Sequence, residues 1–314
     1  VTLAYTWSGG ILAVTLTDAV QYVIIVIGVT LCAYLAIDHL GGFDAMMSIL
    51  YSNPRFETNM KPLANWSLVQ FLGLFFSFLL GEFCAPYYIQ RYASTKSAKD
   101  SKNGLLIFGV HWIFFMATTA AIGLASMAIQ PDVKPDLAFT NLIRDILPPG
   151  ITGLVFGALL AAVMSTGAAM INTSAVIYTR DIYNKFINTA ATQAQLLRQS
   201  RLSTLVVGGI SIGVAIIFQD VFGLMIYMFK LWPSAILPPL MCGLLWGKIS
   251  PYAGAPAVIA GGLSFFLWSD KVLGEPFGIP ANFIGIGMNC LVLFFVHQKM
   301  KGHKPEGPFL PDLN

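Results

Sequence analysis

The sequence predicts an all-α protein whose helices form a polytopic transmembrane bundle. Of its 314 residues, 56% are hydrophobic and 11% are charged, and the mean hydropathy is +0.71. A soluble domain carries about 25% charged residues. Apolar runs of roughly twenty residues, the length that crosses the hydrocarbon of a bilayer, recur along the chain. The lipid bilayer is therefore the expected environment.

Eight apolar segments are long enough to cross the bilayer as helices. They are predicted at residues 10–37, 67–89, 104–129, 150–178, 202–218, 221–246, 253–268 and 280–297. Only Gln219 and Asp220 separate the fifth segment from the sixth, which predicts a tight helical hairpin. Two connecting stretches, GGFDAMMSILYSN and DLAFTNLIRDILPP, space their apolar residues as short interfacial helices do. These short helices are expected to act either as packing elements or as lids.

The charged residues predict topology rather than a charged partner. The net charge of +3 is small, and its carriers fall between the apolar runs, which excludes a nucleic-acid-binding stripe. Of the 18 Lys and Arg residues, 12 fall in alternate loops on one side and five on the other, while Lys230 lies within a span. By the positive-inside rule both ends of the chain are cytoplasmic, in a plasma (inner) membrane protein. Val1 in place of Met predicts a piece of a longer protein.

Three ionisable side chains, Asp18, Glu82 and Lys230, fall inside predicted spans. Such groups cost several kcal/mol in hydrocarbon unless they are paired or hydrated, so each is a functional hypothesis. For Asp18 two interpretations remain open, a structural hydrogen bond between helices and a place on an ion path. Lys230 either snorkels to the interface or points inward, as a partner for Glu82 or a counter-charge for an anionic solute.

Prolines predict two broken helices near these charges. Pro86 follows Glu82 by four residues, so its ring clashes with the Glu82 carbonyl and the helix is expected to kink or unwind there. The break is either structural or lines a binding cavity, as broken helices do in transporters. Three prolines that follow Lys230 predict a second break, namely Pro233, Pro238 and Pro239.

The fourth span, rich in Ala, Gly, Ser and Thr, carries adjacent hydroxyls at Ser165 and Thr166. Small residues allow close helix packing without any ligand, which is one interpretation of this pattern. The other is a cation site, because neutral hydroxyl and carbonyl oxygens suit a hard monovalent cation such as sodium.

Four separated motifs carry a resemblance to a known family. The run LLAAVMSTGAAMINTSAVIYTRDIY resembles the signature helix of the sodium/solute symporter family, which includes sodium/glucose, proline and pantothenate cotransporters. WSGGILAVTLTDAVQ, YYIQRYASTKSAKDSKNG and LLWGKISPYAGAPAVIAGG resemble other elements of that family in the right order. The resemblance implies a single transmembrane domain, 1–314, that is the second half of a LeuT-like core of five plus five inverted-repeat helices. On this basis residues 10–37 would form the last helix of the first repeat, and residues 67–246 would form the second repeat. Residues 253–297 would form peripheral helices, and residues 298–314 would form a cytoplasmic tail.

The resemblance also assigns site residues. It implies that Ala162, through its carbonyl, and the hydroxyls of Ser165 and Thr166 bind sodium, while the remaining ligands come from a core helix that precedes this chain. Asp18 matches an acidic residue near the inward route of the ion. The candidates for the substrate cavity are Glu82, Tyr87 and Lys230. The stretches around them depart from the family's sugar pattern, and the lysine suits a carboxylate-bearing solute.

The function expected from these features is sodium-coupled symport of a small organic solute by alternating access. Sodium, the solute and the lipid bilayer are the expected partners, and a nucleic acid is not. Two alternatives remain open, a symporter-like membrane sensor and a proton-coupled carrier. An enzyme is not expected, because no nucleophile or phosphate-loop motif is present and the four histidines lack metal-ligand spacing.

Overall fold

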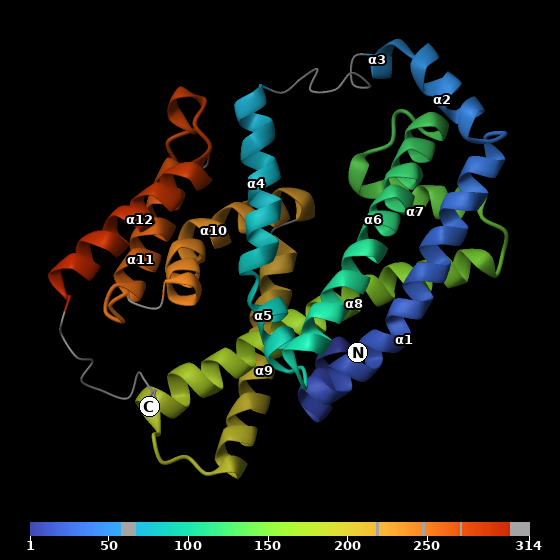
Figure 1. The fold of residues 1–314 in the computed structure, drawn as a ribbon. Helices are drawn as coiled ribbons and strands as arrows, with labels where there is room; N and C mark the ends of the chain where they lie inside the picture. Colours follow the sequence, from blue (N-terminus) through green and yellow to red (C-terminus); the bar gives the residue numbers. More distant parts are fainter. Residues whose placement is uncertain (58–66, 218–219, 247–248, 271, 302–314) are drawn as a thin grey trace. The chain divides into compact units, whose positions relative to one another are not determined.

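The computed structural model describes residues 1–57, 67–217, 220–246, 249–270 and 272–301, and within these ranges it contains helices and no strands (Figure 1). The expected all-α architecture is confirmed. The helices are α1 Thr2–His39, α2 Phe43–Ser52, α3 Pro54–Glu57, α4 Leu68–Cys84, α5 Pro86–Ala93, α6 Ala98–Ile129, α7 Pro135–Ile146, α8 Ile151–Ile177, α9 Gln193–Ile217, α10 Val221–Leu245, α11 Gly254–Trp268 and α12 Ala281–Lys299. A π-helix, Tyr178–Ile187, continues α8, and a 3₁₀ turn, Pro276–Gly278, precedes α12.

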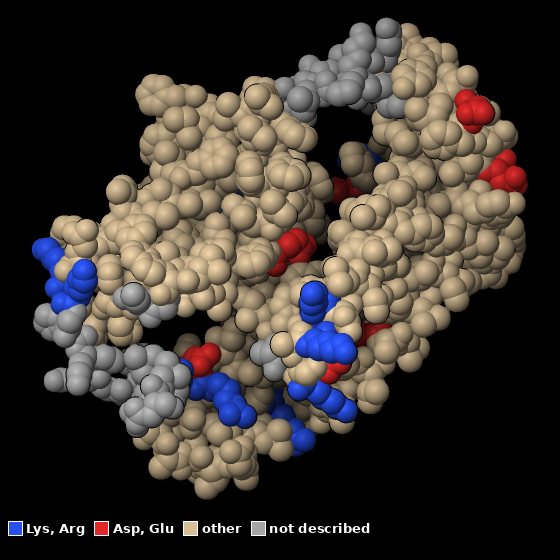
Figure 2. Space-filling model, viewed as in Figure 1, with Lys and Arg blue, Asp and Glu red and all other residues tan. Residues whose placement is uncertain are grey.

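The described helices confirm a multi-pass membrane protein. Six of them are long and apolar enough to cross a bilayer, namely α1, α6, α8 with its π-helical extension, α9, α10 and α12. The pair α4 and α5 forms a seventh candidate span that is bent by 44°. The remaining predicted span, α11, has 15 residues. At 1.5 Å per residue it is about 22 Å long, which is shorter than the roughly 30 Å of hydrocarbon. The face shown in Figure 2 is mostly uncharged, as lipid contact requires.

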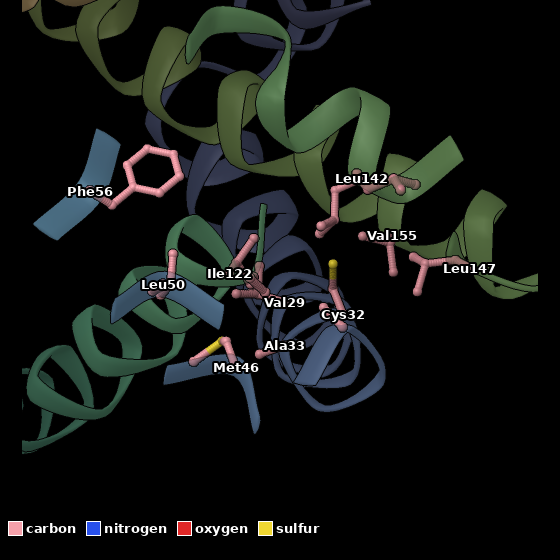
Figure 3. Close-up of a cluster of buried hydrophobic side chains, with 13 residues drawn as sticks. Val29, Cys32, Ala33, Met46, Leu50, Phe56, Ile122, Leu142, Leu147 and Val155 are labelled. Carbon is pink, nitrogen blue, oxygen red and sulfur yellow. The ribbon is translucent and has the colours of Figure 1, made fainter. Parts of the chain in front are cut away.

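The chain divides into two compact units. The first unit comprises Val1–Ala64, Ser94–Asp181 and Ala190–Gly209, and the second comprises Asn65–Ala93, Ile182–Thr189 and Ile210–Asn314. In the first unit α1 packs along α8 and also contacts α6 (Figure 1). A cluster of buried apolar side chains joins these helices, as Figure 3 shows for Val29 and Cys32 of α1, Ile122 of α6 and Val155 of α8.

The two expected interfacial helices form and pack into that cluster. Met46 and Leu50 of α2 and Leu142 of α7 are fully buried in this cluster (Figure 3). Ile143 of α7 is fully buried as well. The apolar faces of α2 and α7 are therefore buried against other helices, which favours packing elements over lids as the role of these two helices.

The first helix begins earlier than predicted. The span is predicted to start at residue 10, yet the chain is already helical from Thr2. Gly10 interrupts the helix with φ 54° and ψ −144°, a conformation that residues with a Cβ rarely adopt. The segment before Gly10 is held by α9, where Gly208 leaves room for the Leu3 side chain and the Arg201 guanidinium lies 5.8 Å from the Trp7 ring centre.

In the second unit α10 is the central helix, and it packs against α4, α11 and α12. The predicted break at its prolines is wrong, because Val221–Leu245 is one continuous helix. Pro238 and Pro239 remove the amide donors that would bind the carbonyls of Ser234 and Ala235. The buried Asn289 of α12 replaces both donors, since its Nδ2 binds the Ser234 oxygen at 3.0 Å and the Ala235 oxygen at 2.7 Å.

The turn between α9 and α10 includes residues 218 and 219, which lie outside the described residues, so the predicted tight hairpin stays a prediction. The α10 side of this turn is described. Asp220 is the N-cap of α10, and its Oδ1 accepts a hydrogen bond from the amide of Gly223 at 2.9 Å.

Candidate functional site

The three predicted sodium ligands lie within one turn of α8. The Ser165 hydroxyl donates to the Ala162 carbonyl oxygen at 3.0 Å, and the Thr166 hydroxyl donates to the same oxygen at 3.1 Å. Ser165 is half-buried and Thr166 is exposed within the described chain. Because each hydroxyl uses its proton on the helix, its oxygen lone pairs remain available to a cation.

The backbone bonds of these hydroxyls are ordinary in themselves. Ser and Thr side chains inside helices commonly bond to the carbonyl three or four residues earlier. An adjacent pair on α6, Thr118 and Thr119, makes the same bonds to Phe114 and Phe115. What distinguishes α8 is that both hydroxyls converge on one carbonyl oxygen, so three neutral oxygens gather in one place. Such oxygens fit a hard monovalent cation.

A tyrosine outside the predicted spans reaches this turn. Tyr5 of α1 donates its hydroxyl to the carbonyl oxygen of Met164 at 3.3 Å, one residue before Ser165. The signal was hidden because Tyr5 lies ahead of the predicted start of the first span. Asp18 lies half-buried on the same helix, and its place on an ion path stays a prediction.

The predicted break between Glu82 and Pro86 is confirmed. α4 ends at Cys84, Ala85 is extended with φ −64° and ψ 119°, and α5 starts at Pro86. The amide of Ala85 donates to the Glu82 carbonyl at 3.2 Å, so the carbonyl is satisfied by a tight turn instead of remaining free.

The break brings Tyr87 to Glu82, and the place of both residues in a substrate cavity stays a prediction. The hydroxyls of Tyr87 and Tyr88 hydrogen-bond to the Glu82 carboxyl group. The Tyr87 ring also lies 6.2 Å from that of Trp232 on α10. Glu82 Oε2 is buried and has no hydrogen-bond partner in the described chain, so the carboxyl group can still accept a donor from a solute.

Lys230 does not join this cluster. Its Nζ lies 3.2 Å from Oε1 of Glu275, in the connection between α11 and α12. The proposed pairing with Glu82 is therefore corrected, although the two helices touch one residue away, where Gly81 lies against Phe229. Glu275 was missed because nothing in the sequence marks a loop residue 45 positions away as the partner of a lysine inside a span.

Comparisons with known proteins identify the family of this chain. The family model described as "Sodium:solute symporter family" matches residues 1–261. The osmoregulated proline transporter OpuE of Bacillus subtilis (strain 168) is 28% identical over 89% of this chain and 57% of its own length. A sodium/proline symporter of Escherichia coli (strain K12) is 27% identical over 86% of this chain and 55% of its own length. The chain thus spans little more than half the length of these two relatives.

Among solved structures, a Na⁺-coupled sialic acid symporter in a substrate-bound outward-open state has the same fold. The TM-score is 0.72 at 20% identity, and the match covers 98% of this chain and 66% of that one. At this identity the likeness concerns the fold alone. The family match over residues 1–261 shows that the chain belongs to the sodium:solute symporter family.

Proposed function

We propose that this chain is part of a sodium-coupled symporter that moves a small organic solute across the membrane by alternating access. The observation that carries the proposal is the convergence of Ser165 and Thr166 on the Ala162 carbonyl oxygen in α8. Relatives named as sodium/proline symporters support the choice of coupling ion. Movement of sodium down its gradient would supply the free energy that drives the transport cycle.

In this proposal Ala162, Ser165 and Thr166 hold sodium with neutral oxygens, while Asp18 lies on its inward route. Sodium and solute need not touch in order to be coupled. Each stabilises the same conformation of the protein, so binding of one raises the affinity for the other by the same factor. Tyr5 is a positioning residue that fixes the α8 backbone next to the ligands.

The solute would contact Glu82 and Tyr87 at the α4–α5 break. The carboxyl group of Glu82 can accept donors, and Tyr87 offers both a hydroxyl and an aromatic face. Lys230 is already paired with Glu275, which weakens its assignment as the counter-charge of a carboxylate. Because two relatives are named as proline transporters, amino acids are the first solutes to test.

We also propose a plasma (inner) membrane location with both ends of the chain cytoplasmic, on the basis of the distribution of Lys and Arg among the loops. In that orientation the start of α10 and the end of α11 face outward. The two alternatives to this function are a sensor, which would bind solute without accumulating it, and a carrier coupled to protons.

Uptake of radiolabelled amino acids, sugars and carboxylates into proteoliposomes, with and without an inward sodium gradient, tests the proposal on the full-length protein. The double variant Ser165→Ala/Thr166→Ala is expected to raise the sodium concentration for half-maximal uptake by about thirtyfold, since the two lost ligands each remove a contact of about 1 kcal/mol and about 1.4 kcal/mol corresponds to a factor of ten. Its matched control is Thr118→Ala/Thr119→Ala, which removes an adjacent pair with the same backbone bonds on α6. Unchanged sodium dependence in the Ser165/Thr166 variant refutes the ion site, and uptake driven only by a pH gradient identifies a proton-coupled carrier.

A further inference from the structure

A cavity lies where α10 begins and α11 ends, and its volume is about 470 Å³. Successive turns of α10 form one wall, with Leu224, Tyr227 and Lys230 among its residues. Phe265 and Phe266 of α11 form the facing wall, and the segment that follows α11 contributes Asp270 and Glu275. The space is large enough for a small organic molecule.

The two positive groups at this cavity are each covered by a carboxylate of the protein. Glu275 binds the ammonium of Lys230 at 3.2 Å, and the pair is largely buried, since the side chains are 22% and 24% exposed. Asp220 covers the positive N-terminal end of α10 by capping Gly223. An anionic ligand would have to displace both of these intramolecular partners.

A third carboxylate, Asp270, leaves the described lining with an excess of negative charge. Three carboxylates therefore face one lysine among the described residues of the cavity. A recess of one sign of charge concentrates ions of the other sign, by about tenfold or more in favourable clefts. The electrostatics of the cavity select a cation.

The walls are suited to an organic cation rather than a hydrated metal ion. Phe265 is fully buried and its ring meets that of Tyr227 edge to face at 5.0 Å, while Phe266, which is 52% exposed, presents the accessible aromatic surface. Aromatic faces attract ammonium and quaternary ammonium groups. Apolar walls gain nothing from a metal ion that keeps its water shell.

We infer that this cavity binds the ammonium group of a small amine or quaternary amine, with Asp270 as its charge partner and the aromatic wall as its apolar contact surface. The ammonium belongs either to a free solute or to the headgroup of a lipid. The lining of the cavity includes none of the candidate sodium ligands of α8. Its test needs neither sodium nor transport, so the cavity and the proposed symport can fail independently.

Thiol labelling of the full-length protein in vesicles measures the electrostatic preference directly. Leu224→Cys places a reporter in the cavity, and Phe222→Cys is the matched control on the same helix, at a side chain that is 59% exposed and outside the cavity lining. The protein without either substitution gives the background from its native cysteines. The cationic trimethylammonioethyl methanethiosulfonate should react faster than the anionic sulfonatoethyl reagent with the Leu224→Cys variant, and this rate ratio should be about tenfold above that of the Phe222→Cys variant.

Three further arms identify the ligand. Asp270→Asn should lower the rate ratio at the reporter position. Choline should slow the labelling of the reporter in phosphatidylglycerol vesicles, while its uncharged isostere 3,3-dimethylbutanol should not, which would assign a soluble amine. Slower labelling in vesicles that contain phosphatidylethanolamine, without added choline, would assign a lipid headgroup.

Equal rate ratios at the two positions, or no reaction of Leu224→Cys with either reagent, would overturn the assignment. Protection by dimethylbutanol as strong as that by choline would do the same, because it would show an apolar pocket without charge selection. If the protein shows the expected rate ratios but no sodium-driven uptake, the assignment of the cavity stands and only the proposed function is refuted.

Discussion

Tyr5 and Met164 join the first described turns of α1 to the middle of α8, through a hydrogen bond of 3.3 Å from the tyrosine hydroxyl to the methionine carbonyl oxygen. The bond meets the α8 backbone one residue before Ser165. Because Tyr5 lies on the far side of the Gly10 interruption from the rest of α1, the short segment before Gly10 is held by other helices as well as by its own chain.

Removing the Tyr5 hydroxyl should weaken sodium binding without unfolding the protein. A hydrogen bond of this kind contributes about 0.5–1.5 kcal/mol, so Tyr5→Phe should raise the sodium concentration for half-maximal uptake about threefold. Tyr34→Phe on the same helix, where the side chain is 65% exposed, is the control and should have no effect. An unaltered sodium dependence of Tyr5→Phe, measured in the same uptake assay, would show that the bond is structural only.

Gly10→Ala should destabilise the kinked form of α1 through the backbone alone. A Cβ at this position meets no atom within 4 Å, but φ is +54°, so the cost is backbone strain, which amounts to about 1–3 kcal/mol. Gly109→Ala on α6, where a Cβ also meets nothing within 4 Å and the backbone is helical, should stabilise slightly. Thermal unfolding in detergent compares the two variants, and equal shifts of the same sign would contradict the strain argument.

Asn289→Ala should cost about 2–4 kcal/mol in the free energy of unfolding, because it leaves the carbonyls of Ser234 and Ala235 without donors in a buried place. Restoring the helical amides with Pro238→Ala/Pro239→Ala should recover most of that loss. If the triple variant Asn289→Ala/Pro238→Ala/Pro239→Ala is no more stable than Asn289→Ala, Asn289 stabilises the protein by packing and not by these hydrogen bonds. Chemical denaturation in detergent micelles provides the measurement.

Acid should loosen α7 from the end of α6. Arg144, at 2.6 Å, holds the pKa of the Asp145 carboxyl below its usual range, and Gln130 at the end of α6 donates to the same carboxylate at 2.8 Å. A depressed pKa in the folded state means that the stabilisation is present above the unfolded pKa, near about pH 4, and is lost as the pH falls through the lower folded value.

Amide hydrogen exchange of Pro135–Ile146, corrected for intrinsic rates, follows this loosening. Protection in the wild type should fall as the pH drops from about 5 to about 3. Asp145→Asn should show reduced protection already at neutral pH and less dependence on pH. A variant as pH-dependent as the wild type would assign the change to another carboxylate.

Local sequence chemistry predicted those features that depend on neighbours in the chain. Pro86 and Glu82 are four residues apart, and the break between them formed as expected. Ala162, Ser165 and Thr166 also meet as expected, since one helical turn brings them together.

Features set by distant partners could not be predicted in this way. The continuity of α10 depends on Asn289, which lies far beyond Pro238 and Pro239 in the sequence. The partner of Lys230 depends on how the segment after α11 folds back. In both cases a polar side chain makes a hydrogen bond to a different helix or loop. The spacing of residues within a single helix does not predict such a bond.

Glu275 has a second contact, because its Oε1 also accepts the amide of Ala281 at the start of α12. One carboxylate oxygen thus fastens the connection between α11 and α12 both to a helix end and to a lysine inside α10. Two residues further on, Phe277 is 93% exposed and, like Glu275, has a positive φ. An antibody fragment that recognises this protruding ring would therefore bind a segment that is attached to the interior of α10 through Glu275. Its binding would report on, or arrest, movements of that helix from outside the bilayer.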